Sequence, residues 1–127
     1  MHNHLRLWIA LTVLALLVGS AQVRAQRVGG YREVSIEDSL VVQAVGAALL
    51  QKETGGTTVM LVAVERAEQQ VVAGMNYRLC LRVRVTDTAE EIETVQLVRA
   101  VVYRNLAGEY RLSSWKEEVC GADPEGE

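Results

Sequence analysis

Histidine is nearly absent from this sequence: the 127 residues contain two, His2 and His4, both within the first 25. Ser-His-Asp and Cys-His catalysis require an imidazole as the base, and many zinc sites require one as a ligand. Beyond residue 25 the chain also has no phosphate-binding loop, no internal repeat and no metal-spaced cluster of ligands. The sequence therefore predicts no catalytic residue, no metal site and no cofactor, and it argues against an enzyme.

Long hydrophobic runs are missing as well. Residues 7–18 form an apolar run of twelve residues, against the roughly 20 that a membrane-spanning helix needs. The run follows Arg6 and precedes small residues, a pattern typical of a cleaved secretory signal. We expect cleavage after Ala25, with Ala21 as the alternative, so that the mature protein starts near Gln26. This predicts a protein that is secreted or held within the secretory pathway, with no membrane association once the signal is removed.

An excess of positive charge is the third absence. The chain has 13 basic and 16 acidic residues, for a net charge of −3. Removal of the signal takes away Arg6 and Arg24, leaving 11 basic against 16 acidic residues and a net charge of about −5. An acidic domain is a poor ligand for nucleic acid. We expect no nucleic-acid partner.

Two long β-strands are the clearest feature that the sequence does contain. Residues 57–68 are rich in Val and Thr, and residues 76–86 alternate between apolar and polar side chains. The small residues of 70–74 lie between them and predict a turn that makes the pair an antiparallel hairpin. Because an isolated hairpin is marginally stable, its apolar face needs a cover. That face carries Tyr77, Leu79, Leu81, Val83 and Val85, and the opposite face carries Arg78, Cys80, Arg82 and Arg84.

A helix over residues 35–53 supplies the cover. Ser35 is the expected N-cap, with Glu37 and Asp38 in the first turn, and Gly55-Gly56 ends the helix. The total absence of Phe implies a thin core. The stripe expected to face the sheet is Val41, Ala44, Val45, Ala48 and Leu49.

The remaining chain predicts a short first strand at residues 31–34, a solvated acidic loop at 86–93, and strands at 94–104 and 109–119 joined by a tight turn at 105–108. The strand at 94–104 has two candidate buried faces, so either both are partly covered or a bulge switches them. One face is Val98, Ala100 and Val102; the other is Val95, Leu97, Val101 and Tyr103. We expect Trp115 to pack in the core.

The turn Gln70-Val71-Val72-Ala73-Gly74 carries the Q-x-V-x-G pattern of the cystatins, inhibitors of papain-like cysteine proteases. The flanking strands, and a Gly-Gly pair about forty residues upstream, strengthen the resemblance, which in the first hairpin is closest to plant-type and secreted cystatins. It implies an α+β fold in which one N-terminal helix packs across a four- to five-stranded antiparallel sheet. The implied organisation is a signal at 1–25, a flexible N-terminal segment with a short strand at 26–34, a cystatin-like domain at 35–120 and a loose acidic tail at 121–127.

The resemblance also implies a function. A secreted cystatin inhibits papain and cathepsin-type enzymes reversibly and competitively by inserting an N-terminal segment and two hairpin turns into the active-site cleft. The side-chain amide of Gln70 would hold the hairpin's own backbone in shape. Secreted and plant cystatins usually carry Pro-Trp at the second turn, where this chain has Leu106-Ala107, so the alternative is a non-inhibitory cystatin-fold binding or structural protein. The implied protease-binding residues are Val28, Gly29, Gly30, Gln70, Val71, Val72, Ala73, Gly74, Leu106 and Ala107.

The two cysteines, Cys80 and Cys120, leave several alternatives open. Export permits a disulfide, but in a simple meander the two strands lie roughly 9–10 Å apart, whereas a bridge joins Cα atoms about 4.4–6.8 Å apart. Either the tail folds back over the sheet, or the cysteines pair between molecules, or they remain thiols. We expect a monomer, with a dimer formed by hairpin exchange as the alternative.

Overall fold

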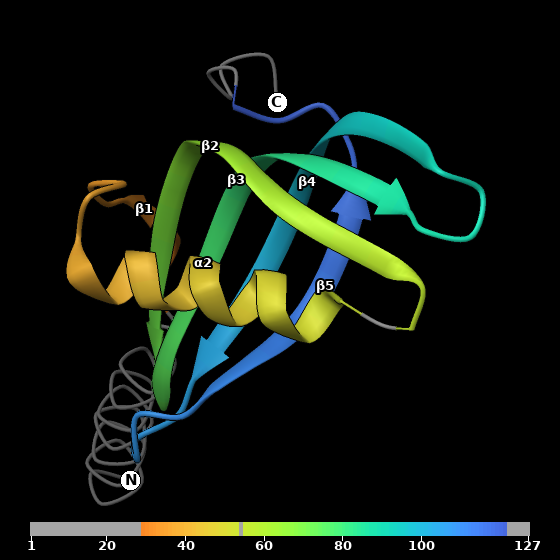
Figure 1. The fold of residues 1–127 in the computed structure, drawn as a ribbon. Helices are drawn as coiled ribbons and strands as arrows, with labels where there is room; N and C mark the ends of the chain where they lie inside the picture. Colours follow the sequence, from red (N-terminus) through yellow and green to blue (C-terminus); the bar gives the residue numbers. More distant parts are fainter. Residues whose placement is uncertain (1–28, 54, 122–127) are drawn as a thin grey trace, which may run out of the picture.

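The computed structural model describes residues 29–53 and 55–121. Five strands form one antiparallel sheet in the order β1-β2-β3-β4-β5, and the helix α2 crosses one face of it (Figure 1). The predicted α+β architecture is confirmed. The predicted signal, Val28 and the tail from residue 122 lie outside the described residues. In order, the elements are β1 (Arg32–Glu33), α2 (Ser39–Lys52), β2 (Thr57–Val72), β3 (Gly74–Asp87), β4 (Ile92–Arg104) and β5 (Tyr110–Glu117).

The helix starts later than the sequence predicts. Its N-cap is Asp38, whose carboxylate accepts hydrogen bonds from the amides of Leu40 at 2.9 Å and Val41 at 3.3 Å. Ser35 instead accepts a hydrogen bond from the Glu37 amide at 3.1 Å in the turn that precedes the helix. The prediction of Ser35 as the cap, with Glu37 and Asp38 inside the first turn, is therefore wrong, because the carboxylate of Asp38 satisfies the first helical amides.

The core lies between α2 and the facing side of the sheet. The predicted helical stripe is confirmed: Val41, Ala44, Val45 and Ala48 are buried, and Leu49 packs partly buried against them. Tyr77 has the largest volume among the fully buried side chains of the described residues, and Trp115 packs at the core margin as predicted. The sheet contributes the buried side chains Val59, Ala67, Tyr77, Leu79, Leu81, Val83, Val98, Ala100 and Val102.

The strands extend further toward their turns than expected. Val72 pairs with Gly74, so that Ala73 alone separates β2 from β3, and the predicted five-residue turn at 70–74 is too long. The acidic connection between β3 and β4 likewise shrinks from residues 86–93 to residues 88–91.

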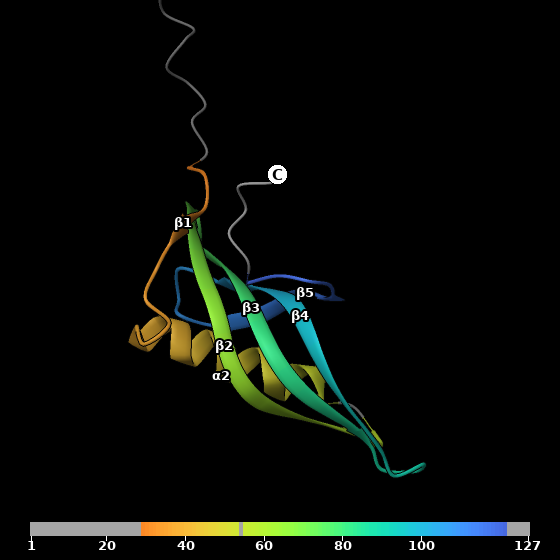
Figure 2. The same cartoon turned by 90° about the horizontal axis from the view of Figure 1, so that it is seen from above.

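The sheet curves around the helix (Figures 1 and 2). In the pairing of β2 with β3 the register shifts between Leu61 and Ala63 and again between Val64 and Arg66. Such bulges bend a strand and increase its twist. A third shift lies in the pairing of β4 with β5, where it leaves Ser113 of β5 without an opposite residue.

The burial of the side chains along β4 shows which of its faces lies in the core. Val98, Ala100 and Val102 are fully buried along one face, so no switch of face occurs within β4. On the other face Leu97, Val101 and Tyr103 are partly buried, whereas Val95 is exposed. Of the two alternatives, the switch of faces by a bulge does not occur in β4; one face is fully buried and the other is partly covered.

The face of the sheet away from the helix carries a network of ion pairs and the disulfide. Cys80 and Cys120 are bonded, with their Cα atoms 5.7 Å apart. The tail folds back over the sheet to reach Cys80, and the Glu118 amide donates to the Leu97 carbonyl at 3.1 Å. Of the alternatives for the cysteines, the intramolecular bridge is the one observed. The ion pairs on this face join Arg66 to Glu33, Arg78 to Glu68, Arg82 to Glu65, Arg84 to Glu93 and Arg99 to Glu118.

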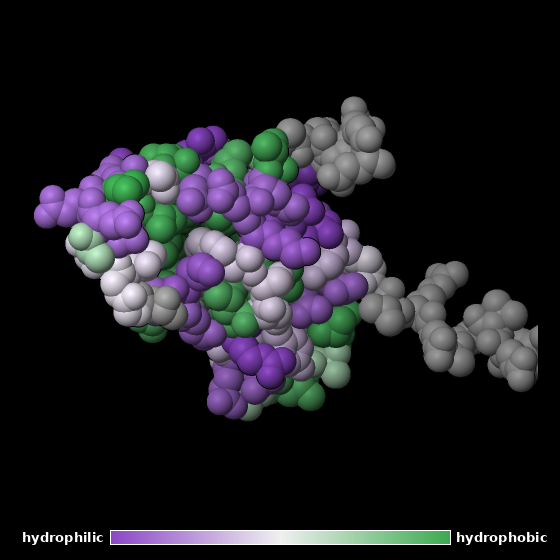
Figure 3. Space-filling view, turned by 90° about the vertical axis from the view of Figure 1, so that its right-hand side faces the viewer, coloured by the Kyte–Doolittle hydropathy of each residue, from purple (hydrophilic) through white to green (hydrophobic). Residues whose placement is uncertain are grey.

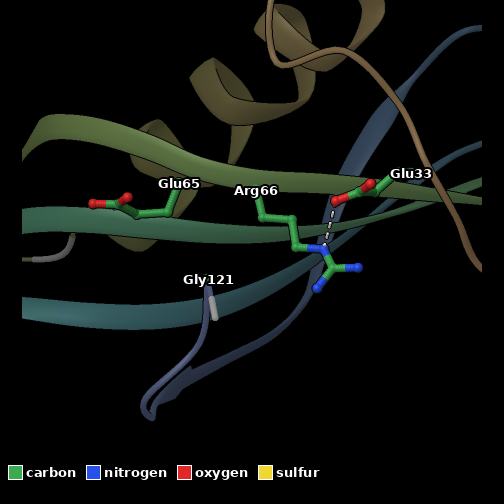
Figure 4. A pocket seen from close by; sticks show the side chains of 4 residues that line it. All are labelled: Glu33, Glu65, Arg66 and Gly121. Carbon is green, nitrogen blue, oxygen red and sulfur yellow. Dashed lines mark ion pairs between the residues drawn. The ribbon is translucent and has the colours of Figure 1, made fainter. Parts of the chain in front are cut away.

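A small polar hollow of about 220 Å³ opens beside this tail and is lined by Glu33, Glu65, Arg66 and Gly121. Arg66 Nε lies 3.0 Å from a carboxylate oxygen of Glu33, whereas Glu65 points away from both (Figure 4). The pair links β1 to β2. From the side where the β3–β4 connection protrudes, hydrophobic side chains lie scattered among hydrophilic ones (Figure 3). Within the described residues, no helix is both long and apolar enough to cross a membrane.

Candidate functional site

Three chain segments meet at one end of the sheet, and we call them together the rim: Gly29-Gly30, residues 70–74 and residues 105–108. The strand order is a simple meander, which places the β2–β3 and β4–β5 turns at the same end (Figure 1). The tail that follows β5 leaves at the opposite end (Figure 1). The structure therefore brings together every predicted site residue that it describes.

The two hairpins of the rim are joined by a side chain that the sequence analysis did not single out. The hydroxyl of Tyr103, near the end of β4, donates a hydrogen bond to the carbonyl of Ala73 at the tip of the first hairpin. Met75 of β3 pairs directly with Arg104 of β4. The first tip is thus held against the base of the second hairpin.

Gly74 is the residue at which this packing leaves no room for a side chain. Its φ of +107° lies in the region that favours glycine. A Cβ built there would overlap the Arg104 carbonyl oxygen and lie 2.9 Å from the Tyr103 hydroxyl. The glycine of the Q-x-V-x-G pattern is therefore required both by the backbone conformation and by the neighbouring hairpin.

Gln70 attaches the N-terminal segment to the first hairpin. Its Nε2 donates to the carbonyl of Gly29 at 2.9 Å, and its Oε1 accepts from Asn76 Nδ2 at 3.1 Å. The expectation that this amide holds the hairpin's own backbone is wrong. The amide bonds instead to the backbone of another segment, because its position on β2 places it beside residue 29.

Tyr31, which follows Gly29-Gly30, holds the N-terminal segment against β3. The Arg78 guanidinium lies over the Tyr31 ring, 4.1 Å from its centroid. Arg78 also donates to both carboxylate oxygens of Glu68, at 3.0 and 2.9 Å. These bonds lower the pKa of Glu68, while burial raises the pKa of the Tyr31 hydroxyl. The chain that enters the rim is thereby stacked on β3.

The second turn has its own internal frame. Asn105 Oδ1 accepts from the Glu109 amide at 2.9 Å, Asn105 Nδ2 donates to the Glu109 carboxylate at 3.2 Å, and the Gly108 amide donates to the Asn105 carbonyl at 3.0 Å. Leu106 is 84% exposed at the tip. Ala107 beside it, and Val71 and Ala73 on the first hairpin, are exposed as well. The tips are consequently small or apolar and uncharged.

Tyr103 and Asn76 bond to residues of the rim, and the sequence analysis did not predict either contact. Tyr103 lies on the face of β4 away from the helix, two positions before the second turn. A tyrosine hydroxyl so close to a turn is the one signal in the sequence that could have predicted its contact with the first hairpin. Asn76 faces Gln70 directly across β2 and β3, a relation that only the register reveals. Among the described residues, no group of three His, Cys, Asp or Glu side chains is placed to hold a metal ion.

With this geometry described, comparison with known proteins identifies the class. Residues 29–104 match the family model of the cystatin domain, and the chain belongs to the cystatin family. Cystatins are inhibitors rather than enzymes, in agreement with the prediction made from the missing histidines.

Particular relatives include salivary cystatin-L2 of Ixodes scapularis, which is 34% identical over 122 residues, covering 81% of this chain and 92% of the relative. Two solved structures share the fold at lower identity. The salivary cystatin of the soft tick Ornithodoros moubata has a TM-score of 0.56 at 22% identity, covering 72% of this chain and 98% of that one. Dimeric human cystatin F has a TM-score of 0.59 at 14% identity, covering 76% and 93%.

Proposed function

We propose that the protein is a secreted, reversible and competitive inhibitor of papain-like cysteine proteases. Membership of the cystatin family suggests cysteine protease inhibition as the class of activity. The observation that carries the specific proposal is the rim, in which Tyr103 and Gln70 bond three separate segments to one another.

A rim of this composition is suited to a narrow groove. Val71, Ala73 and Leu106 enter a cleft without the cost of burying a charge. Protease–inhibitor interfaces typically bury about 1,600 Å², and complete burial of Leu106 would contribute roughly 1.5–3 kcal/mol. The hydrogen bonds among the segments reduce the entropy lost on binding, since the tips are already ordered. Inhibition then consists of blocking the catalytic cysteine without presenting a scissile bond to it.

The N-terminal segment would add an anchor. The carbonyl of Gly29 accepts a hydrogen bond from Gln70 of the first hairpin, and Val28 directly precedes Gly29 in the sequence. We propose that Val28 enters a substrate pocket while Gly29-Gly30 provides the bend. Burial of a valine side chain is worth roughly 1.5–3 kcal/mol, or one to two decades of affinity.

Secretion is part of the proposal. The apolar run at residues 7–18 and the small residues after it favour a cleaved signal. The two tick relatives are named salivary cystatins. Extracellular papain-like enzymes are accordingly the expected targets.

A second candidate function rests on one feature of the rim. The second turn carries Leu106-Ala107 where secreted and plant cystatins usually carry a large aromatic residue. Since aromatic anchors dominate interface energetics, their absence favours the alternative of a cystatin-fold binding protein that does not inhibit proteases.

Titration of papain and a cathepsin-type exopeptidase with the mature domain separates the two candidates. We expect competitive inhibition of at least one enzyme at concentrations below about 1 μM.

The substitution Leu106→Asp should raise the Ki of the domain for that enzyme by at least roughly tenfold, because a carboxylate would be buried at the tip. Val119→Asp is the matched control, since Val119 is 87% exposed and lies outside the rim. Full activity of both enzymes in the presence of the domain would reject inhibition of the tested class, and equal effects of the two substitutions would reject the rim as the binding surface.

A further inference from the structure

Two groups of arginines in the described chain differ in their partners. Five of them form ion pairs with glutamates across the face of the sheet away from the helix. Within residues 29–53 and 55–121, Arg104 and Arg111 have a tyrosine ring instead of a carboxylate as the partner. Both belong to the hairpin that carries the second turn of the rim.

The register places these two arginines on opposite faces of the same hairpin. Arg104 pairs with Tyr110, and Arg111 pairs with Tyr103. The guanidinium carbons lie 5.8 Å from the Tyr110 ring and 5.9 Å from the Tyr103 ring. On one face Tyr110 donates a hydrogen bond to Gln43 of the helix at 3.2 Å, whereas on the other face Tyr103 donates to the Ala73 carbonyl of the first hairpin. One positive charge therefore flanks each side of the turn that presents Leu106.

Stacking on tyrosine holds a guanidinium in place without neutralising it. Its N–H groups remain suited to bidentate recognition of a carboxylate. Arg104 Nε is buried and has no hydrogen-bond acceptor in the described part of the chain. The carboxylate of this turn belongs to Glu109 and already accepts a hydrogen bond from Asn105. The second hairpin thus carries a local positive charge in a protein whose net charge is −3.

We infer that Arg104 and Arg111 form a basic clamp around the second turn that binds carboxylates on the wall of the target's active-site cleft. The preferred targets are then papain-like proteases whose cleft wall beside the catalytic cysteine is acidic. This inference rests on the proposed function and specifies its partner. Charge complementarity at an interface chiefly accelerates association and discriminates among partners. The clamp would therefore contribute selectivity, whereas an aromatic residue at the second turn would have contributed affinity.

The experiment measures association rate constants of the full mature domain with two papain-like proteases, one with an acidic and one with a non-acidic cleft wall. The test variant is the double substitution Arg104→Gln and Arg111→Gln. The matched control is Arg82→Gln with Arg84→Gln, which removes the same charge from the face of the sheet away from the helix. Thermal unfolding of each variant verifies that it is folded.

With the acidic-walled enzyme at low ionic strength, we expect the test variant to associate more slowly than the wild type by on the order of tenfold. The difference should shrink as salt is raised, and the control variant should associate at a rate close to the wild type. Equal rates for the wild type and the test variant would overturn the clamp while leaving inhibition intact. Equal slowing of both variants would also overturn it, because net charge alone would then account for the rate. A wild-type domain that inhibits neither enzyme would instead remove the proposed function itself.

Discussion

Gly74 concentrates two constraints in one residue. Its backbone has a positive φ, and the second hairpin packs where its side chain would lie. A pattern glycine in a cystatin could be explained by close approach to the protease alone. In this chain the free domain already requires glycine at position 74, so we expect a substitution there to change the stability of the domain as well as its fit to a proposed target.

Gly74→Ala should lower the free energy of unfolding by at least about 1–2 kcal/mol, because an L-residue is strained at this φ and its Cβ would overlap Arg104. Urea unfolding of the purified domain measures the change. Gly30→Ala is the matched control, since nothing lies within 4 Å of the position of its Cβ. An alanine at position 74 that unfolds at the same urea concentration as the wild type would contradict the packing described for the rim.

Glu68 makes the stability of the domain depend on pH. Its hydrogen bonds from Arg78 lower its pKa below the ordinary value of 4.5, and its side chain is only 14% exposed. The folded state therefore holds the charged carboxylate more strongly than the unfolded chain does. The resulting stability is present above pH 4.5 and is lost as the pH falls through the lower pKa of the folded state.

Glu68→Gln should accordingly flatten the decline in unfolding free energy below about pH 4.5. Urea midpoints measured at several acidic pH values test this, with the disulfide intact. Glu117→Gln provides a comparison on an exposed glutamate that leaves the Glu68–Arg78 pair in place. A slope for Glu68→Gln that is as steep as that of the wild type would show that other carboxylates govern acid unfolding.

Among the elements, α2 contains a residue of low helix propensity, Gly46. Gly46 lies in the middle of α2, is exposed, and has nothing within 4 Å of the position of its Cβ. Gly46→Ala should stabilise the domain by about 1 kcal/mol, because alanine has the higher helix propensity. The reverse change next to it, Ala47→Gly, should destabilise by a similar amount. Thermal unfolding compares the two, and a destabilised Gly46→Ala variant would mean that the helix needs this glycine for packing.

The sequence predicts the elements more reliably than it predicts their ends. Alternation in β3 and the stripe on α2 reveal which faces are buried, since both depend on local periodicity. The start of the helix does not follow from such a pattern, because Ser35 and Asp38 are both good capping residues. Tertiary contact decides between them: the Val34 amide donates to Ala67 of β2, and residues 35–38 are then needed to turn the chain into the helix.

In the candidate site, too, local motifs can be predicted from the sequence, whereas the contacts between them cannot. The Q-x-V-x-G pattern and the second turn are visible as short local motifs, and the structure brings them together with Gly29. The bonds from Gln70 to Gly29 and from Tyr103 to Ala73 join residues separated by 41 and 30 positions. Such partners depend on sheet curvature and register, which no local spacing encodes.

For the whole molecule, the Cys80–Cys120 bridge closes a loop of 40 residues and fastens the tail to β3. Replacing both cysteines with alanine should lower the free energy of unfolding by about 4 kcal/mol through the added freedom of the unfolded chain. Inhibition should persist wherever the variant is folded, since the bridge is separate from the rim. Urea unfolding and a papain assay measure the two effects.

Glu118→Gln is the control, because it removes only the ion pair of the tail with Arg99. It should lower the free energy of unfolding by less than about 1 kcal/mol. A similar loss in both variants would assign the stabilisation to the tail contacts rather than to the disulfide bond.

The route of the tail also determines how this domain can be immobilised. Because the chain that follows β5 leaves the sheet at the end opposite the two hairpin tips (Figure 1), a tag or solid support attached on that side would leave the tips facing solution. The cross-link at Cys120 would transmit any pull on such a tether to the middle of β3 and spare the hairpins. For the inhibitor proposed above, immobilisation on that side would give an affinity matrix for papain-like proteases.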